Sequence, residues 1–226
     1  MLVSEIFYSL QGEGIYSGVP SIFIRTYGCS LSCSLCDSKY AISGKDYFSM
    51  EVDEITTQIA AGYKNVNHIV ITGGEPMIQP DIEELVRELN NGNYNITIET
   101  NGIRYKNLKV DLFSISPKMS NSYFGKEESK TIYEKNNTFE YIPKFIDSGC
   151  RYQFKFIVKT VEDIDEILEF RNRFHILNKD IFLMPEGVTK EEQQSKMEFV
   201  SEFCKKYRFN LCPRLHIYIW GNKRGV

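Results

Sequence analysis

Apolar positions along this chain follow two alternating patterns, which are short continuous runs and stripes with helical spacing. The short runs predict strands within 5–14 and at 21–28, 68–72, 95–100, 111–116, 152–158, 180–184 and 215–220. The stripes predict helices over about 49–61, 81–89, 139–148, 160–168 and 190–207. Strands that alternate with helices favour an α/β fold with a mostly parallel sheet.

About six strand–helix units can be counted, which is too few for a closed barrel of eight units. We therefore expect a partial, open βα barrel, although periodicity alone does not separate it from a doubly wound sheet. In both folds, ligands bind at the C-terminal ends of the strands. The chain is expected to form one domain over 1–226, with a cysteine-rich loop at 28–38 and a polar surface excursion at about 118–137.

Composition limits the classes of function. The 226 residues include 27 basic and 30 acidic side chains, and a net charge of −3 gives no electrostatic case for a nucleic-acid partner or an anionic membrane. The N-terminal segment lacks the features of a signal peptide, and no apolar run approaches the roughly 18–20 residues of a membrane span. We expect a soluble, cytoplasmic protein.

Three of the six cysteines lie in one polar loop, GCSLSCSLCDS. Cys29, Cys33 and Cys36 have the spacing C-x3-C-x2-C, and no fourth cysteine or histidine follows nearby. Without a signal peptide, such a cluster indicates metal or redox chemistry rather than disulfides. Structural zinc with a distant fourth ligand and three unrelated core thiols are two possible interpretations. We favour a third, a [4Fe–4S] cluster with three thiolates and one open iron.

The cysteine spacing resembles the signature of radical S-adenosylmethionine (SAM) enzymes. In that superfamily, SAM chelates the open iron, and one electron from the cluster cleaves SAM to a 5′-deoxyadenosyl radical that abstracts hydrogen from the substrate. The segment ITGGEPM at 71–77 supports the resemblance, because its two glycines allow the backbone to come close to a ligand. The resemblance implies that Gly74 and Glu75 bind the methionine amino group and that Glu99 lies near SAM.

Six motifs, in their order along the chain, resemble the 7-carboxy-7-deazaguanine synthase family. They are EIFYSLQGEG, FIRTYGCSLSCSLCDS, TGGEPM, IETNG, SPK and the final WGNKRGV. The similarity implies a radical ring contraction of 6-carboxy-5,6,7,8-tetrahydropterin to 7-carboxy-7-deazaguanine, with loss of ammonia, in queuosine or deazapurine biosynthesis. It also implies that SAM is regenerated and that Mg²⁺ assists.

The resemblance also assigns roles to single residues. Substrate contacts are expected from Leu10, Gln11, Gly12, Arg25, Thr72 and Val226, with Glu13 and His216 as further candidates. SAM contacts are expected from Leu35, Cys36, Asp37, Gly74, Glu75, Glu99, Ser116, Pro117, Lys118, Met184, Pro185 and Glu186. Ser38 is the expected magnesium ligand, since Mg²⁺ prefers oxygen ligands and keeps waters. A guanidinium at Arg25 suits a substrate that carries a carboxylate.

The partners implied by the resemblance are a pterin substrate, a second copy of the chain in a homodimer, and a flavodoxin-like or ferredoxin-like reductase. Two other hypotheses are an activase that generates a glycyl radical on a partner protein, and a non-catalytic iron–sulfur or zinc protein. The LQGEG and C-terminal motifs argue against the activase. A non-catalytic protein would not need the GGEP motif. The sequence names no acid or base for the later steps and no downstream pathway.

Overall fold

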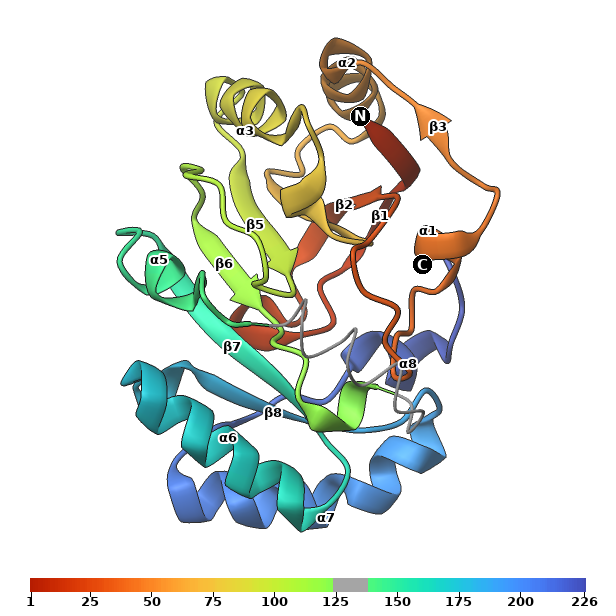
Figure 1. Ribbon diagram of the computed structural model, residues 1–226. Coiled ribbons are helices and arrows are strands. Elements are labelled where there is room, and N and C mark those ends of the chain that lie inside the picture. Colours follow the sequence, from red (N-terminus) through yellow and green to blue (C-terminus); the bar gives the residue numbers. More distant parts are fainter. Residues whose placement is uncertain (124–137) are drawn as a thin grey trace.

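The computed structural model describes residues 1–123 and 138–226, and this part of the chain forms one curved sheet with helices along its outer side (Figure 1). The nine described strands, in spatial order, are β3 (Phe48–Ser49), β1 (Leu2–Leu10), β2 (Pro20–Thr26), β4 (His68–Gly73), β5 (Asn95–Thr100), β6 (Leu112–Ile115), β7 (Arg151–Val158), β8 (Ile181–Pro185) and β9 (Asn210–Leu211). The α-helices are α1 (Tyr40–Ser43), α2 (Val52–Gly62), α3 (Ile82–Asn91), α5 (Ile142–Ile146), α6 (Val161–Phe174), α7 (Lys190–Tyr207) and α8 (Leu215–Trp220).

The sheet is parallel from β2 through β4 to β9, while β1 and β3 run antiparallel to their neighbours. β3 and β9 are its two edges, so the expected open, mostly parallel barrel is confirmed. Ile24 on β2 pairs with Ile71 on β4, which pairs with Ile98 on β5, and all three side chains are fully buried. This register brings the C-terminal ends of the parallel strands to one edge, where a ligand site is expected.

β7 shows how the two faces of the sheet differ. Successive side chains of a strand point to opposite faces. Phe154 and Phe156 are fully buried and their rings meet Phe170 of α6. Gln153 and Lys155, at the alternate positions, are buried as well, and Lys155 lines a cavity inside the barrel. The outer face is therefore a hydrophobic core, whereas the inner face carries polar side chains.

The strand predicted at 215–220 is wrong, because this segment forms helix α8. β9 pairs with β8 and ends the described sheet, and Pro213 follows shortly after it. Proline has no N–H for a sheet hydrogen bond, so the strand does not continue. The chain turns back across the barrel, where the Leu215 N–H donates to the Gly12 carbonyl at 2.9 Å. There a helix can satisfy its own backbone groups.

Two predicted helix starts are also wrong. α2 is capped by Glu51 rather than Ser49, because Glu51 and Glu54 form a capping box and Ser49 belongs to β3. The helix predicted over 139–148 begins later, since Phe139 has a left-handed φ of 56° that a helix interior does not allow. α6 and α7 begin after threonine N-caps with capping boxes, and for α7 the predicted bounds are confirmed.

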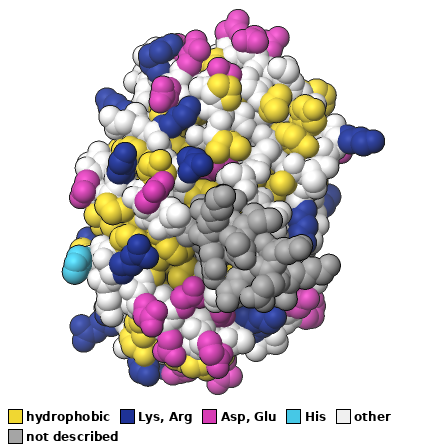
Figure 2. Space-filling model, in the orientation of Figure 1, with side chains coloured by type: hydrophobic (Ala, Val, Ile, Leu, Met, Phe, Trp, Pro, Cys, Tyr) yellow, Lys and Arg dark blue, Asp and Glu magenta, His cyan; other side chains and the backbone are white. Residues whose placement is uncertain are grey.

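Of the polar excursion expected at about 118–137, the structure describes only 118–123, which includes a 3₁₀ turn at Ser120–Ser122. The rest of that segment lies outside the described residues. Basic and acidic side chains are interspersed over the face in Figure 2. Among the helices that the structure describes, none has the length and apolar character needed to cross a membrane.

Replacing Phe154 by alanine should destabilise the fold by about 3–5 kcal/mol, because the side chain is fully buried and leaves a cavity. Phe48→Ala is the matched control, since this ring is 65% exposed on an edge strand and its loss should cost less than about 0.5 kcal/mol. Urea unfolding followed by circular dichroism measures both. Equal midpoint shifts for the two variants would contradict the assigned core.

Candidate active site

The C-terminal ends of the strands surround a cavity of about 410 Å³. The expected site residues that line it are Leu10, Gln11, Gly12, Glu13, Arg25, Cys29, Cys33, Leu35, Cys36, Asp37, Ser38, Thr72, Gly74, Glu99, Ser116, Lys118, Met184, His216 and Val226. Glu75, Pro117, Pro185 and Glu186 do not line it. The topology thus brings most of the set together, and the role of each residue stays a prediction.

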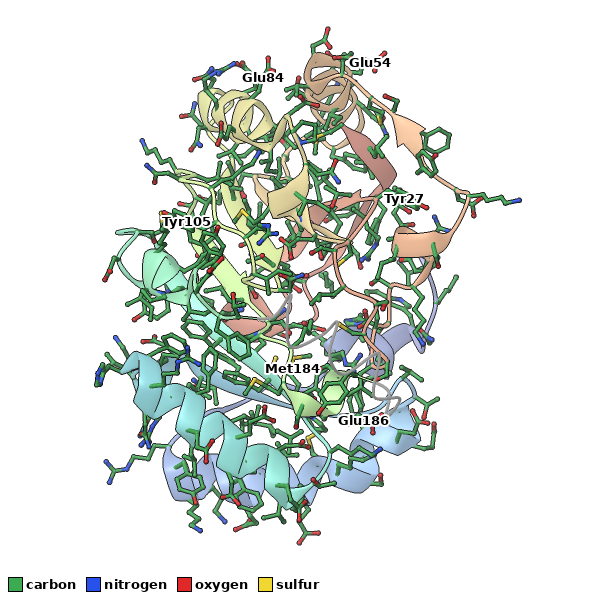
Figure 3. All side chains as sticks on the ribbon, in the orientation of Figure 1. Tyr27, Glu54, Glu84, Tyr105, Met184 and Glu186 are labelled. Carbon is green, nitrogen blue, oxygen red and sulfur yellow. The ribbon has the colours of Figure 1, made fainter. Side chains whose placement is uncertain are left out.

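The segment after β8 divides into two parts. Met184 is buried and lines the cavity, whereas the Glu186 carboxylate pairs with Lys196 of α7 at 3.1 Å (Figure 3). Of the three residues expected there for SAM, the structure therefore places only Met184 at the cavity wall.

The three clustered cysteines line the cavity with partly buried thiols. Burial raises the pKa of Cys29 to about 11 and also raises the pKa of Cys33 and Cys36, so a bound metal must displace their protons. Within 1–123 and 138–226, no three His, Cys, Asp or Glu side chains lie close enough to hold a single metal ion. A [4Fe–4S] cluster takes its thiolates at different irons, so it accepts ligands that are farther apart.

The GGEP turn packs directly on the cysteine loop. The Gly74 N–H donates to the Thr26 carbonyl at 3.0 Å, and the Glu75 N–H donates to the Gly28 carbonyl at 2.8 Å. A Cβ atom on Gly74 would overlap the Gly28 carbonyl, and Gly73 has a left-handed φ of 117°. Glycine is required at both positions, and this contact fixes the beginning of the cysteine loop against β4.

Glu75 stabilises the backbone below the cavity. Its carboxylate is fully buried and accepts hydrogen bonds from Thr100 Oγ1 at 2.6 Å, the Asn101 N–H at 2.8 Å and the Met77 N–H at 3.0 Å. Burial raises its pKa, and these donors partly offset that effect. The Asn101 side chain contacts the cysteine loop, with its Nδ2 lying 3.8 Å from the Cys29 sulfur. Glu75 thus joins the ends of β4 and β5 beside the cysteines.

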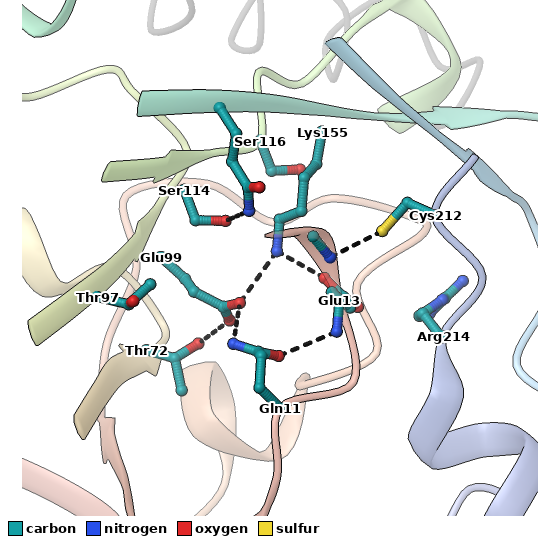
Figure 4. Close-up of polar contacts among 12 residues, drawn as sticks. Gln11, Glu13, Thr72, Thr97, Glu99, Ser114, Ser116, Lys155, Cys212 and Arg214 are labelled. Atoms are coloured by element: carbon teal, nitrogen blue, oxygen red, sulfur yellow. Dashed lines mark hydrogen bonds and ion pairs between the residues drawn. The ribbon is translucent and has the colours of Figure 1, made fainter. Parts of the chain in front are cut away.

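A second buried network lies on the inner side of the barrel (Figure 4). Lys155 Nζ contacts Glu13 Oε2 at 2.6 Å and Glu99 Oε1 at 3.0 Å. Gln11 Nε2 and Thr72 Oγ1 also donate to Glu99, at 3.3 and 2.8 Å. Burial alone would raise the pKa of Glu99, but Lys155, the Thr72 hydroxyl and the nearby Arg25 charge hold it below its usual value. Glu99 is therefore an ionised acceptor in the cavity wall.

Arg25 lies on the strand that leads into the cysteine loop. Its Nε donates to Glu5 Oε1 at 2.7 Å and its Nη1 to Ser38 Oγ at 3.3 Å. The guanidinium also lies over the rings of Phe7 and Tyr40, 5.5 and 5.7 Å from their centres. These contacts fix the orientation of a cation at the cavity wall, where it can bind a carboxylate.

Sequence reasoning missed Lys155 and Arg214, which both line the cavity. Lys155 had a signal, since it is the one charged residue inside the largely apolar strand 152–158, and lysine is rarely buried unless it is paired. Arg214 is 3% exposed and donates to Asp37 Oδ2 at 3.0 Å and to the Gly187 carbonyl at 2.7 Å. It had no comparable signal, because its partners are distant in the sequence.

The open parallel sheet, the three-cysteine loop at its C-terminal edge and the glycine turn packed on that loop define a radical SAM protein. The model of the Radical SAM superfamily matches residues 23–194, about three quarters of the chain. The cofactors of this class are a [4Fe–4S] cluster and SAM, and the three cavity-lining thiols fit the cluster.

Similar proteins identify the family within this superfamily. The chain is 33% identical to the 7-carboxy-7-deazaguanine synthase of Halobacterium salinarum over 97% of this chain and 90% of the relative. It is 34% identical to that of Pyrobaculum aerophilum over 99% and 96%. The crystal structure of QueE from Escherichia coli has a similar fold, with a TM-score of 0.69 and 23% identity over 95% of this chain and 94% of that chain. The chain belongs to the 7-carboxy-7-deazaguanine synthase family, as its motifs predict.

Glu75→Gln should weaken the hydrogen bonds that connect the segments after β4 and β5. A glutamine has one acceptor oxygen, so its amide N–H₂ would face an N–H or O–H donor that the carboxylate now satisfies. A buried unsatisfied donor costs about 1–3 kcal/mol, which should lower the melting temperature and weaken SAM binding in calorimetric titration. Glu84→Gln, on the exposed face of α3, is the control. SAM affinity equal to that of the control would contradict the assigned role.

Proposed function

We propose that this chain catalyses the radical ring contraction of 6-carboxy-5,6,7,8-tetrahydropterin to 7-carboxy-7-deazaguanine, with loss of ammonia, in queuosine or deazapurine biosynthesis. The observation that carries the proposal is one cavity that three cysteine thiols, the Arg25 guanidinium and the buried Glu13–Lys155–Glu99 network all line. Similarity to named synthases over nearly the full chain supports this assignment over a glycyl-radical activase or an electron carrier.

Cys29, Cys33 and Cys36 would hold the cluster, which together with SAM would supply the radical for hydrogen abstraction at the substrate carbon that bears the carboxylate. The chain's own residues bind and orient the substrate. Arg25 binds the substrate carboxylate, and Gln11, Thr72 and Glu99, which line the same cavity, contact the ring. α8 and residues 222–226 line the cavity and reduce the access of water.

Ser38 is proposed as the magnesium ligand of the chain. Its hydroxyl donates to Asp37 Oδ1 at 2.9 Å and accepts from Arg25 Nη1 at 3.3 Å, at the edge of the cavity. Mg²⁺ there would keep waters and take oxygens from the substrate carboxylate. A cation at this point would share that carboxylate with the guanidinium.

The proposal includes two protein partners. The cluster needs one electron from outside, so a flavodoxin-like or ferredoxin-like reductase should supply it. The family resemblance further suggests a homodimer. The identity of the reductase can be tested by comparing turnover with candidate electron donors.

The function is tested anaerobically with reconstituted protein, reductant, SAM, Mg²⁺ and the carboxytetrahydropterin. We expect 7-carboxy-7-deazaguanine by mass spectrometry. Formation of 5′-deoxyadenosine without this product would remove the proposed substrate but leave the radical SAM class. Absence of both from protein that has a full cluster would contradict the proposed reaction type.

Ser38→Ala should raise the Mg²⁺ concentration needed for half-maximal turnover and leave the visible spectrum of the cluster unchanged. Removal of the hydroxyl deletes one oxygen ligand, which should weaken Mg²⁺ binding about tenfold or more. Ser32→Ala is the matched control, because this exposed serine of the same loop does not line the cavity. Loss of the cluster in Ser38→Ala alone would mean that Ser38 supports the loop rather than the metal.

A further inference from the structure

Lys155 brings together three segments that are distant in the sequence. It lies on β7 and contacts Glu13, which follows β1, and Glu99, near the end of β5. The side chain of Lys155 is only 4% exposed, and those of Glu13 and Glu99 are 14% and 21% exposed. The three groups therefore form a triad at the cavity wall, with the ammonium inside and the carboxylates nearer to the cavity.

The charges of this triad do not balance. One ammonium faces two carboxylates, so the three groups together carry one negative charge. Burial alone would lower the pKa of Lys155, but the two carboxylates outweigh this effect and raise it, so the lysine remains a cation. Buried like charges repel unless a cation or hydrogen-bond donors separate them. Lys155 is the described cation that contacts both carboxylates.

The orientation of the neighbouring amide is also determined. The Glu13 N–H donates to Gln11 Oε1 at 3.1 Å, so the Nε2 end of Gln11 must be the group that faces Glu99, at 3.3 Å. The Thr72 hydroxyl donates to the second oxygen of Glu99 at 2.8 Å. Gln11, Thr72 and Lys155 thus all donate to Glu99, and this fixes its carboxylate in one orientation.

Glu13 differs from Glu99 in one respect. Its Oε2 accepts from Lys155, and among the hydrogen bonds of the described residues none involves its Oε1. The side chain lines the cavity. Glu13 therefore offers an acceptor oxygen to a ligand. A carboxylate in this position suits a planar ring edge with adjacent N–H donors, such as the amino-amide edge of a pterin.

We propose that Lys155 is a positioning residue that holds the carboxylates of Glu13 and Glu99 at a fixed separation on either side of one ammonium, so that the pair binds the N–H donor edge of the substrate ring. This inference rests on the proposed function for the identity of the ring, but not for the behaviour of the two carboxylates. In this arrangement Arg25 orients the carboxylate of the substrate and the triad orients the ring edge that carries the N–H donors.

Other titratable groups near the triad are neutral or paired with a different residue. Burial raises the pKa of Cys212 to about 12, so this thiol, which accepts the Gly14 N–H at 3.0 Å, is neutral. Burial lowers the pKa of His68, whose two ring nitrogens contact hydroxyl groups. Arg25 is paired with Glu5 at 2.7 Å, and it lowers the pKa of Glu99 less than Lys155 does. Lys155 is therefore the described cation whose loss leaves Glu13 and Glu99 without a common partner.

Infrared spectroscopy of the cluster-loaded protein tests this behaviour without an activity assay. In Lys155→Met, two unneutralised carboxylates face each other, so one should take up a proton between about pH 6 and about pH 8 and show the carbonyl stretch of a neutral acid. The double variant Lys155→Met, Glu99→Gln should lack this band, and so should wild type and Lys155→Arg. Lys205→Met, on the exposed face of α7, is the control. Absence of the band from a folded Lys155→Met protein would overturn the proposal.

Kinetics test the consequence for the substrate. In Lys155→Met, KM for the pterin should rise about tenfold or more at neutral pH and should fall again as pH increases, because ionised carboxylates bind the N–H donors. The KM of wild type and Lys155→Arg should change little over this range. A purely structural role would instead lower kcat and cluster content in parallel at every pH, which would overturn the proposal.

Glu13→Gln provides a second test of the proposal if Lys155→Met does not fold. It removes one acceptor charge and leaves the lysine paired with Glu99, so KM should rise without a new pH dependence. An unchanged KM would overturn the proposal. If wild type makes no deazaguanine, the proposed substrate fails, and the infrared result alone decides whether Lys155 controls the two carboxylates.

Discussion

The contact between the GGEP turn and the cysteine loop is the constraint on which the site depends. Gly74 and Glu75 donate to the backbone on either side of the β2–loop junction, and Gly74 allows no side chain there. Because β2 and β4 are neighbours in a parallel sheet, the turn after β4 necessarily meets the loop after β2. Glu75 extends the same join to β5 through Asn101, which reaches Cys29. Backbone hydrogen bonds thus position the cysteine loop, and the Asn101 side chain contacts the Cys29 thiol.

The cavity has two chemically different sides. The cluster side is formed by loops and glycines, and its thiols have raised pKa values until a metal binds. The other side is formed by the inner face of the barrel, where Lys155, Glu13 and Glu99 are rigid and charged. A substrate between them can be oriented by fixed charges while the reactive group approaches from the cluster side. Such preorganisation is what a positioned hydrogen abstraction requires.

The sequence was sufficient for a mostly parallel α/β fold, and most of the site residues expected from its motifs do line the cavity, because both depend on local signals. Apolar periodicity predicted the parallel strands, and the cysteine and glycine motifs marked the loops at their ends. Prediction from the sequence failed where the structure depends on contacts between residues that are distant along the chain. Helix α8 replaces a predicted strand because β9 already ends the sheet. Arg214 was missed because Asp37 and Gly187 become its neighbours only in the folded chain. Glu75 was expected at the ligand, but its partners keep its carboxylate below the cavity.

Electron paramagnetic resonance of the reduced, reconstituted protein tests the central claim most directly, which is that three thiolates hold a cluster with one iron open to the cavity. Addition of SAM should change the signal of the cluster, because SAM becomes a ligand of the open iron. The change should be lost in Gly74→Ala, whose new methyl group displaces the turn from the Gly28 carbonyl. A cluster signal that is identical with and without SAM in wild type would contradict the account.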